Sequence, residues 1–425
     1  MEKEKYDWIV VGGGISGIVL AEILCRGGKS VLLLEKNSQL ASETSKIFHE
    51  WLHSGALYSL APDKLLTLRY LLGATDDLFE YYSNFTNMNL RPTASGINVT
   101  KKGWFNNEHI EYRYKKHRFN PVWQSLVSRS VNMVDLVNQH DWLRRRAGSE
   151  YDKSKIKFSY WFNNIPKQIA SKNFFYTKMS PDITMNSRVL ISDILSSALN
   201  KGLKVLTNSM VISVNEKIDA TFVKTKDEVF QAENVVVCSP DVISKLSDLP
   251  IKTSYAPIAI VENVDKNETS FVELDYNIKK CINLLKKGGG IGQAGGISVA
   301  TKGEIKPYLS YIINEHKKRN PGIEVVDTYV GLKKELTRNG EKRNYLYHIN
   351  QNSRSVWFVV LGKFSLAFSL APEFYRRIYG ENPPKSIDKL EGHSINDIIS
   401  KTSWEEVIIN SRREHGHDKA TKKIN

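Results

Sequence analysis

Three glycines near the N-terminus are spaced as in a turn that holds a pyrophosphate. They lie within Gly12-Gly13-Gly14-Ile15-Ser16-Gly17. Gly12 permits a tight turn, Gly14 lets the backbone approach a phosphate, and Gly17 lets a helix pack closely against the preceding strand. Glu35 follows about 20 residues later, where a carboxylate accepts hydrogen bonds from ribose hydroxyls and would repel a 2′-phosphate. This spacing predicts a site for NAD or FAD and disfavours NADP.

The elements that would position these residues follow in the required order. Trp8–Val11 predicts a short buried strand, Ile18–Arg26 predicts a helix, and Ser30–Leu34 predicts a second strand that ends at Glu35. The helix N-terminus, near Ile15 and Ser16, would aim free amides and the positive end of its dipole at the phosphates.

The segments after Glu35 resemble those of FAD-dependent enzymes of the D-amino-acid oxidase superfamily. They read Lys36-Asn37-Ser38-Gln39-Leu40-Ala41-Ser42-Glu43-Thr44-Ser45 and Trp51-Leu52-His53-Ser54-Gly55-Ala56-Leu57-Tyr58. The His-Ser-Gly stretch is most similar to the branch that holds L-2-hydroxyglutarate and glycerol-3-phosphate dehydrogenases. The resemblance implies that FAD is the cofactor, that Thr44 and Ser45 lie near its pyrophosphate, and that His53, Ser54 and Gly55 pass close to the flavin ring.

Two later blocks extend the resemblance. The first predicts a helix and three strands, at Arg188–Leu199, Leu203–Leu206, Met210–Val214 and Val235–Pro240. In the family this block returns to the dinucleotide-binding domain, which implies that Val211 meets the adenine and that Cys238 and Ser239 lie beside the nucleotide. The second block is a predicted strand, Val356–Leu361, followed by Gly362, Lys363, Phe364 and Ser365. Relatives place a glycine turn and a helix N-terminus there, which would stabilise negative charge on the reduced flavin.

The resemblance implies an α/β fold, with a Rossmann-like FAD-binding domain of the glutathione-reductase type and an inserted α+β substrate domain. The expected boundaries are 1–90, 185–245 and 325–385 for the discontinuous FAD-binding domain and 91–184 and 246–324 for the substrate domain. Residues 386–425 are expected to form a helical or disordered basic tail. The candidate FAD-binding residues are Gly12, Gly14, Ile15, Ser16, Gly17, Glu35, Lys36, Thr44, Ser45, His53, Ser54, Gly55, Val211, Cys238, Ser239, Gly362, Lys363, Phe364 and Ser365.

His53 is the candidate catalytic residue, and Tyr58 and Lys333 are the candidate substrate contacts. The implied reaction moves a hydride to flavin N5 from a carbon that bears a hydroxyl or an amine, as in a 2-hydroxy acid, an amino acid or a sugar phosphate. An imidazole suits the base that takes the heteroatom proton at neutral pH, although relatives also use a histidine here to contact or attach the flavin. Lys333 stands where relatives often carry an arginine for a substrate carboxylate.

The composition favours some classes of partner but does not identify a particular one. The formal net charge is +14 at pH 7, which favours anionic partners such as an acidic small-molecule substrate. The three cysteines form no C-x-x-C pair, so neither a disulfide framework nor a metal site is expected. Because no signal peptide and no membrane-spanning run is recognisable, the sequence predicts a cytoplasmic protein. No residue pattern indicates the electron acceptor.

Two alternatives stay open. The first is another flavoenzyme, such as an amine oxidase or a sugar mutase, although those families usually carry a glycine pair just after the acidic residue. The second is an RNA-modifying flavoprotein, which the basic and aromatic first insertion suggests. Nucleic-acid binding is the less favoured reading because no recognised motif accompanies the charge. The residues behind it are Lys101, Lys102, Trp104, Tyr112, Arg113, Tyr114, Lys115, Lys116, His117, Arg118, Trp142, Arg144, Arg145 and Arg146.

Two further segments are interpreted from their composition. The stretch from Ser411 to Lys423 has few apolar residues and is expected to be solvated. The glycine-rich stretch Gly288–Gly296 lacks the flanking strand and helix of a phosphate loop and is expected to be a loop.

Overall fold

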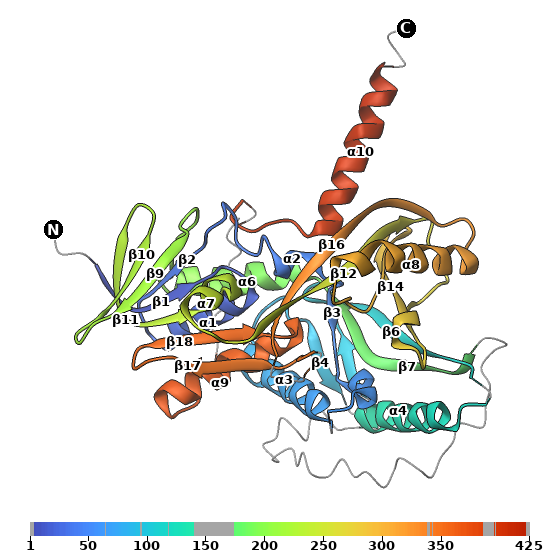
Figure 1. Cartoon of the computed structure of the whole chain (residues 1–425), viewed down its shortest axis with the longest axis horizontal. Helices are drawn as coiled ribbons and strands as arrows, with labels where there is room; N and C mark the ends of the chain where they lie inside the picture. Colours follow the sequence, from blue (N-terminus) through green and yellow to red (C-terminus); the bar gives the residue numbers. More distant parts are fainter. Residues whose placement is uncertain are drawn as a thin grey trace.

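Two eight-stranded sheets lie one after the other along the long axis of the molecule (Figure 1). The computed structural model describes residues 4–63, 65–93, 96–117, 119–139, 174–337, 341, 343–385, 395 and 397–421. Arg118, Trp142 and Arg144–Arg146 of the basic insertion, and Lys422 and Lys423 of the tail, lie outside this range.

The first sheet contains the N-terminal strand at its centre. Its strand order is β17-β18-β11-β1-β2-β8, and β9 and β10 extend it as a meander from β11. The strands β8, β2, β1, β11 and β18 run parallel, whereas β17 pairs antiparallel with β18. The bounds are β1 Lys5–Val11, β2 Val31–Leu34, β8 Lys204–Leu206, β9 Val211–Glu216, β10 Thr221–Thr225, β11 Val229–Val237, β17 Tyr347–Gln351 and β18 Val356–Leu361.

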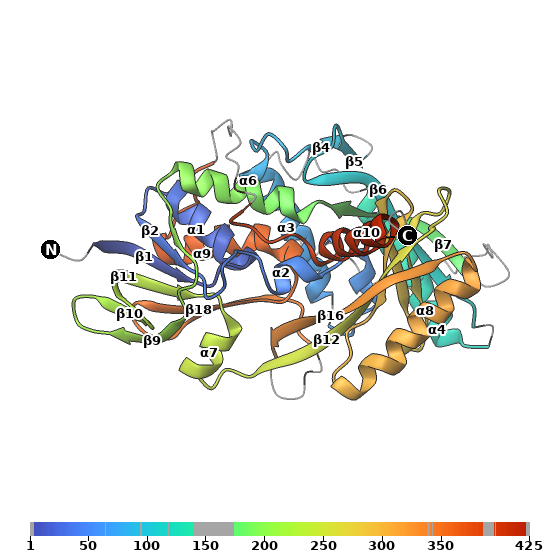
Figure 2. The ribbon, with the colours of Figure 1, turned by 90° about the horizontal axis from the view of Figure 1, so that it is seen from above.

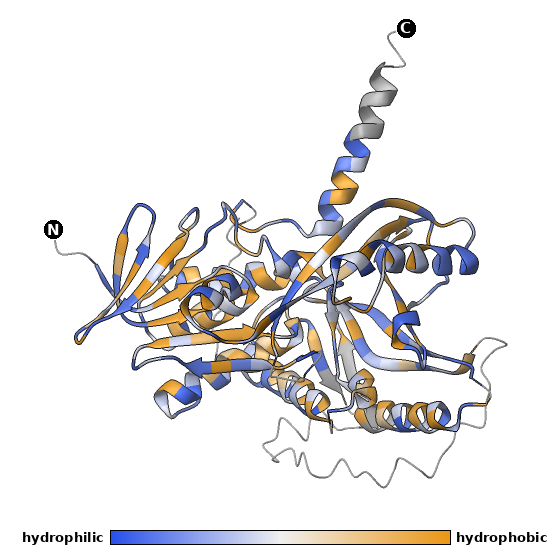
Figure 3. Ribbon diagram, viewed as in Figure 1, coloured by the Kyte–Doolittle hydropathy of each residue, from blue (hydrophilic) through white to orange (hydrophobic). Residues whose placement is uncertain are grey.

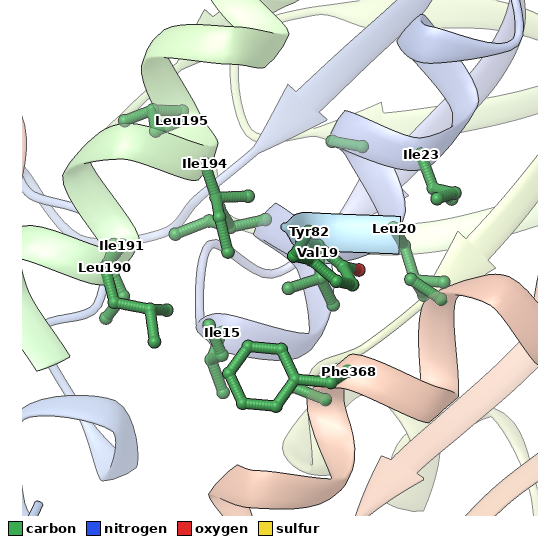
Figure 4. Packing of buried hydrophobic residues seen from close by; sticks show 14 of the residues in the cluster. Ile15, Val19, Leu20, Ile23, Tyr82, Leu190, Ile191, Ile194, Leu195 and Phe368 are labelled. Carbon is green, nitrogen blue, oxygen red and sulfur yellow. The ribbon is translucent and has the colours of Figure 1, made fainter. Parts of the chain in front are cut away.

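Alternating residues of the central strands supply two separate cores. Trp8 and Val10 of β1 pack under helices on one face, whereas Ile9 and Val11 pack on the other face against β9, β10 and a short helix. Figure 4 shows the first of these cores, where Ile15 and Val19 of one helix face Ile194 and Phe368 from neighbouring helices. The helices are α1 Ile15–Arg26, α3 Leu66–Tyr82, α6 Ser187–Asn200 and α9 Ala367–Tyr379 on the first face and α7 Pro240–Leu246 on the second.

The second sheet is built mostly from the two insertions. Its order is β16-β12-β15-β14-β13-β6-β7-β3, and its only parallel neighbours among the described strands are β13 and β6. The bounds are β3 Trp51–Leu52, β6 Phe105–Lys115, β7 Phe174–Met185, β12 Ile251–Glu262, β13 Ser270–Leu274, β14 Ile282–Gly288, β15 Ile291–Gly296 and β16 Glu324–Leu336. A separate pair, β4 Leu90–Thr93 and β5 Gly96–Val99, lies beside it.

Two helices cover opposite faces of the second sheet. Helix α4, Pro121–Gln139, packs with Val272 and Leu274, whereas α8, Ile305–Arg319, packs with Phe271, whose side chain points the other way. Figure 3 shows that α8 is largely hydrophilic, as expected of a helix with one packed face. Short helical turns complete the description: α2 Thr44–Ile47, η1 Ala56–Leu60, η3 Ile278–Lys280, η4 Lys302–Glu304 and η5 Phe364–Leu366.

Two of the sequence-based expectations need correction. Strand β16 lies within the range 325–385 expected for the FAD-binding domain, yet it pairs with β12 in the second sheet along its whole length. The expected loop Gly288–Gly296 is a hairpin, in which β14 and β15 join through glycines with positive φ. Figure 2 shows β12 and β16 running together between the two halves of the molecule.

The C-terminal region returns to the first half of the chain. Residues 397–406, here called the C-terminal strap, lie along the segment after Glu35: Leu40 N–H donates to the Ile398 carbonyl at 2.8 Å, and Ser400 N–H donates to the Leu40 carbonyl at 3.0 Å. Helix α10, Ser403–Thr421, then projects from the body (Figure 1). The tail is therefore helical from Ser403 to Thr421, and its first described part is held against the protein.

Candidate functional site

A cavity of about 2050 Å³ opens between the carboxyl ends of the first sheet and the second sheet. It is lined by seventeen of the candidate residues: Gly12, Gly14, Ile15, Ser16, Glu35, Lys36, Thr44, Ser45, His53, Tyr58, Val211, Cys238, Ser239, Lys333, Gly362, Lys363 and Phe364. Gly17, Ser54, Gly55 and Ser365 do not line it. Segments that are far apart in sequence thus meet at one site.

The N-terminal glycines adopt the geometry that their spacing predicts. Gly12 has a φ of +107°, and Gly14 precedes the first residue of α1. A Cβ on Gly17 would lie 1.9 Å from the Gly12 carbonyl oxygen, so only glycine allows this helix to sit so close to the turn. Glu35 receives the Gly13 N–H at 2.7 Å and the Asn37 N–H at 2.9 Å, which fixes its carboxylate at the end of β2.

Ser45, from another part of the chain, lies at the N-terminus of α1, and Thr44 precedes it. The Ile15 N–H donates to Ser45 Oγ at 2.9 Å, and Thr44 Oγ1 donates to the Leu332 carbonyl at 3.1 Å. Lys36 Nζ forms an ion pair with Glu43 Oε1 at 2.6 Å. A helix N-terminus with glycines and hydroxyls around it suits a pyrophosphate.

The second block places its residues around the same turn. Cys238 N–H donates to the Val11 carbonyl at 2.8 Å, and a Cβ on Gly12 would lie 3.2 Å from Ser239 N. Val211 lines the cavity nearby. Burial raises the pKa of the Cys238 thiol, so this cysteine is a neutral wall residue.

The third block reaches the cavity from the end of β18. Gly362 leaves no room for a side chain, since a Cβ would lie 2.5 Å from the Leu346 carbonyl oxygen. Lys363 and Phe364 line the cavity, and η5 continues into α9 as the sequence predicts. Ser365 instead receives the His53 N–H at 3.1 Å and donates to the Trp51 carbonyl at 3.3 Å. Its hydroxyl joins this block to the His53 segment.

His53 lies at the cavity wall between two aromatic rings. Its ring centroid is 4.2 Å from that of Trp51 and 5.4 Å from that of Tyr58. Its Nδ1 is 3.6 Å from Asp182 Oδ2, slightly beyond a normal hydrogen bond. Burial lowers the pKa of His53 to about 4; Asp182 opposes this effect, and Lys363 and Lys333 add to it. The imidazole is therefore neutral at pH 7.

Three cations and one carboxylate lie together beside His53. Glu335 Oε1 is 2.8 Å from Lys333 Nζ, and Arg343 donates to both oxygens of Glu335, at 2.7 and 3.0 Å. Lys363 Nζ lies 4.9 Å from the Tyr58 ring centroid and 4.8 Å from that of Tyr345. We call Lys333, Arg343 and Lys363 the cation cluster.

The cation cluster carries more positive charge than its carboxylate neutralises. Burial lowers the pKa of Lys363 far below its usual range, and Lys333 and Arg343 lower it further. Burial also lowers the pKa of Lys333, with Glu335 opposing and Arg343 reinforcing the effect. A bound anion would relieve this repulsion.

Sequence reasoning missed four residues of this region: Asp182, Glu335, Arg343 and Tyr345. Glu335 could have been found, because in a strand it shares a face with Lys333 two residues earlier. Arg343 and Tyr345 lie in an irregular segment, and Asp182 belongs to an insertion, so no local pattern marks them.

The structure buries several aromatic residues of the basic and aromatic insertion and pairs Arg113 with carboxylates. Trp104, Tyr112 and Tyr114 are fully buried and pack in the cores, so they offer no surface for stacking on bases. Arg113 pairs with Glu111 and Glu268. Within the described residues, no helix is both long and apolar enough to cross a bilayer.

Comparison with known proteins identifies the family. A family model described as FAD dependent oxidoreductase matches residues 7–279. Among curated proteins, the chain is 30% identical over 83 residues to a mitochondrial L-2-hydroxyglutarate dehydrogenase of Arabidopsis thaliana, covering 20% of this chain and 17% of the relative. It is 49% identical over 55 residues to a UDP-galactopyranose mutase of Mycoplasma pneumoniae, covering 11% of this chain and 14% of the relative. These matches therefore span less than a fifth of either relative.

Solved structures share the fold over nearly the whole chain. Glycine oxidase from Geobacillus kaustophilus superposes with a TM-score of 0.63 at 11% identity, covering 92% of this chain and 99% of the other. L-alpha-glycerophosphate oxidase from Mycoplasma pneumoniae, with FAD bound, gives a TM-score of 0.59 at 12% identity, covering 92% and 98%. The expected fold class is thus confirmed, and the chain belongs to the family of FAD-dependent oxidoreductases, with FAD as its cofactor.

Proposed function

We propose that the enzyme oxidises a small anionic molecule at a carbon that bears a hydroxyl or an amine. The observation that supports this most directly is the cation cluster, which lies beside the neutral His53 in the same cavity as the dinucleotide turn. A carboxylate or phosphate would contact Lys333, Arg343 or Lys363 and bring its neighbouring carbon to the ring. Two structural neighbours are named as a glycine oxidase and an L-alpha-glycerophosphate oxidase, and glycine and glycerophosphate both carry such an anionic group.

We propose that the ADP half of FAD binds at the Gly12–Gly17 turn. Ile15, Ser16, Thr44 and Ser45 would contact the pyrophosphate, and Glu35 would accept the ribose hydroxyls. Val211, Cys238 and Ser239 would line the adenosine side, and Gly362 to Phe364 would approach the ring. Gly17, Ser54, Gly55 and Ser365 would act through packing, because they do not line the cavity.

The proposed reaction removes two electrons and two hydrogens from the substrate. Bound FAD supplies the acceptor for the hydride. His53, neutral at pH 7, would accept the proton from the hydroxyl or amine as the carbon becomes a carbonyl or an imine. The cation cluster would hold the anionic group so that the reacting carbon is fixed before transfer, and Tyr58 would pack against Lys363 and the substrate.

We propose the domain division with one altered boundary. Residues 1–90, 185–245 and 337–385 would form the FAD-binding domain, and 91–184 and 246–336 the substrate domain, because β16 pairs with β12. As part of the proposal the enzyme works in the cytoplasm, since Cys25, Cys238 and Cys281 stand as free thiols.

The test is anaerobic mixing of the FAD-loaded enzyme with 2-hydroxy acids, amino acids and sugar phosphates. We expect one of these anionic compounds to bleach the flavin absorption near ~450 nm. In Lys333→Met the KM for that compound should rise about tenfold or more, since a hydrogen bond to a charged group contributes about 1.5 to 3 kcal/mol. Lys318→Met is the control, because Lys318 lies at an exposed site outside the cavity lining and pairs with Glu315 on its own helix.

Two outcomes would contradict the proposal. Bleaching by neutral alcohols or amines with no response to anionic compounds would remove the assigned role of the cation cluster. Conversion of a sugar nucleotide without any lasting bleaching would favour a mutase.

A further inference from the structure

Asp182 is a fully buried carboxylate that lies next to His53 but outside the cavity lining. It belongs to β7, in the second sheet, and it has no exposed surface. Its Oδ2 accepts from Trp51 Nε1 and from Tyr112 Oη, both at 2.7 Å. Its Oδ1 accepts from the Ser54 N–H at 2.8 Å and from Ser54 Oγ at 2.5 Å. Both oxygens are thus fixed by donors.

These donors tie two parts of the site together. Trp51 and Ser54 flank His53 in the segment expected to pass the flavin, whereas Tyr112 belongs to β6 beside β7. A buried ion is tolerated only when hydrogen bonds replace water. Burial raises the pKa of Asp182, but the contacts with His53, Ser54 and Tyr112 outweigh it and leave that pKa below its usual range. The carboxylate therefore stays ionised.

His53 faces this carboxylate with the ring nitrogen that has no other partner. Nδ1 is buried and has no hydrogen-bond partner among the described residues, and Asp182 Oδ2 is 3.6 Å away. The other charged or titratable groups around the ring lie on different elements: Lys363 after β18, Lys333 on β16, His49 before β3, and Tyr58 on η1. Asp182 is the anion among them.

We propose that Asp182 is the positioning residue for His53, holding the proton of the neutral imidazole on Nδ1 and leaving Nε2 as the proton acceptor. The inference rests on the proposed function of His53 as the base. A movement of a few tenths of an ångström would turn the 3.6 Å approach into a hydrogen bond. Because neither Asp182 nor Tyr112 lines the cavity, substitutions there act on the reaction only through the His53 segment.

The first test compares Asp182→Asn with Asp193→Asn in the FAD-loaded enzyme. Asp193 is a matched control, since its carboxylate also accepts from a tryptophan, Trp104 Nε1, at 2.7 Å, but lies away from the cavity. In Asp182→Asn we expect flavin reduction to slow by about tenfold or more with little change in KM, because a general base loses its alignment. Asp193→Asn should retain the rate.

The second readout is the His53 tautomer, measured by long-range ¹H–¹⁵N spectra and assigned with His53→Gln. The wild-type ring should carry its proton on Nδ1 at pH 7, and Asp182→Asn should lose that preference. An unchanged tautomer and an unchanged rate in a folded Asp182→Asn enzyme would overturn the inference. If His53→Gln reduces flavin at the wild-type rate, the proposed base fails, whereas the tautomer still reports whether Asp182 positions the ring.

Tyr112→Phe keeps the inference testable if Asp182→Asn does not fold. It removes one donor from the carboxylate while retaining the buried ring. The less stabilised carboxylate should hold the imidazolium more strongly, so the acid limb of the rate profile should move to higher pH. An acid limb that coincides with the wild-type one would contradict the positioning role.

Discussion

Lys363 carries its ammonium between the rings of Tyr58 and Tyr345, beside two other cations. Lys363 lines the cavity. Its low pKa means that the free enzyme holds the Lys363 proton weakly. A substrate anion would strengthen that hold by offsetting Lys333 and Arg343.

Substrate binding should therefore be coupled to proton uptake at Lys363. The bound anion raises the pKa of Lys363, so binding is tightest at pH values where the free enzyme already holds the Lys363 proton. The KM should therefore increase as pH rises above the Lys363 pKa of the free enzyme. The measurement is KM between pH 6 and 10 for the wild type and for Lys363→Met. The variant should show a higher KM with a flatter pH dependence. If the pH dependence is the same as that of the wild type, a group other than Lys363 takes up the proton. Lys318→Met, at an exposed site, is the control.

At the level of single residues, spacing predicted the backbone geometry of the Gly12–Gly17 turn. Gly12, Gly14 and Gly17 act through backbone geometry, and Glu35 acts through a carboxylate placed at the end of β2. Both depend on short separations in sequence. The cation cluster could be predicted only in part. Lys333 and Lys363 stood in recognisable motifs, whereas Arg343 reaches the cluster through folding of the chain between β16 and β17.

At the level of elements, no pattern in the sequence predicted the position of the C-terminal strap. Trp404 Nε1 donates to Glu50 at 2.9 Å, and Lys46 pairs with Glu406 at 2.8 Å. Glu50 also receives Lys287 at 2.7 Å and precedes β3 and His53. The strap thus contacts the segment that carries both Ser45 and His53.

Trp404→Phe should weaken FAD binding. It removes one hydrogen bond to a charged group, which contributes about 1.5 to 3 kcal/mol, and keeps an aromatic ring over Lys287. The checks are Tm and the FAD dissociation constant from flavin fluorescence. Trp104→Phe loses the equivalent bond to Asp193 and should lower Tm without a matching loss of FAD. Equal loss of FAD from both variants would indicate general destabilisation.

Elements with continuous apolar runs were predicted more accurately than elements rich in glycine. The strands β1, β2 and β18 lie close to their expected positions, because buried parallel strands are apolar on both faces. Strand β15 was expected to be loop because of its glycines. Those glycines instead make room for partners: a Cβ on Gly295 would lie 2.3 Å from His49 Nε2. That need arises from packing across the sheet and leaves no local signature.

For the whole molecule, two buried histidines and the half-buried His49 make stability depend on pH. Burial lowers the pKa of His49 to about 3 and the pKa values of His53 and His316 to about 4. An unfolded chain binds these protons near pH 6.5. As pH falls below about 6.5 the unfolded state therefore takes up more protons than the folded state, and stability decreases.

The Tm of the FAD-loaded enzyme should fall between pH 6.5 and 4.5, above the range in which most carboxylates titrate. His316→Gln should reduce this slope because it removes one of the three groups. His316 belongs to α8, where its ring lies beside Phe271, and it does not line the cavity. A Tm that stays constant across this interval would mean that these rings are protonated in the folded protein.

The central pair of the first sheet also determines when the cofactor site can form during synthesis. Strand β1 lies between two parallel neighbours that are made at different times. β2 follows β1 closely in sequence, whereas β11 ends only at Val237. The turn at Gly12 touches Ser239, so half of the nucleotide pocket is translated more than 200 residues after the other half. In a nascent chain one edge of β1 and the glycine-rich turn therefore stay unpaired until β11 has been made, and the nucleotide pocket can be complete only after that point.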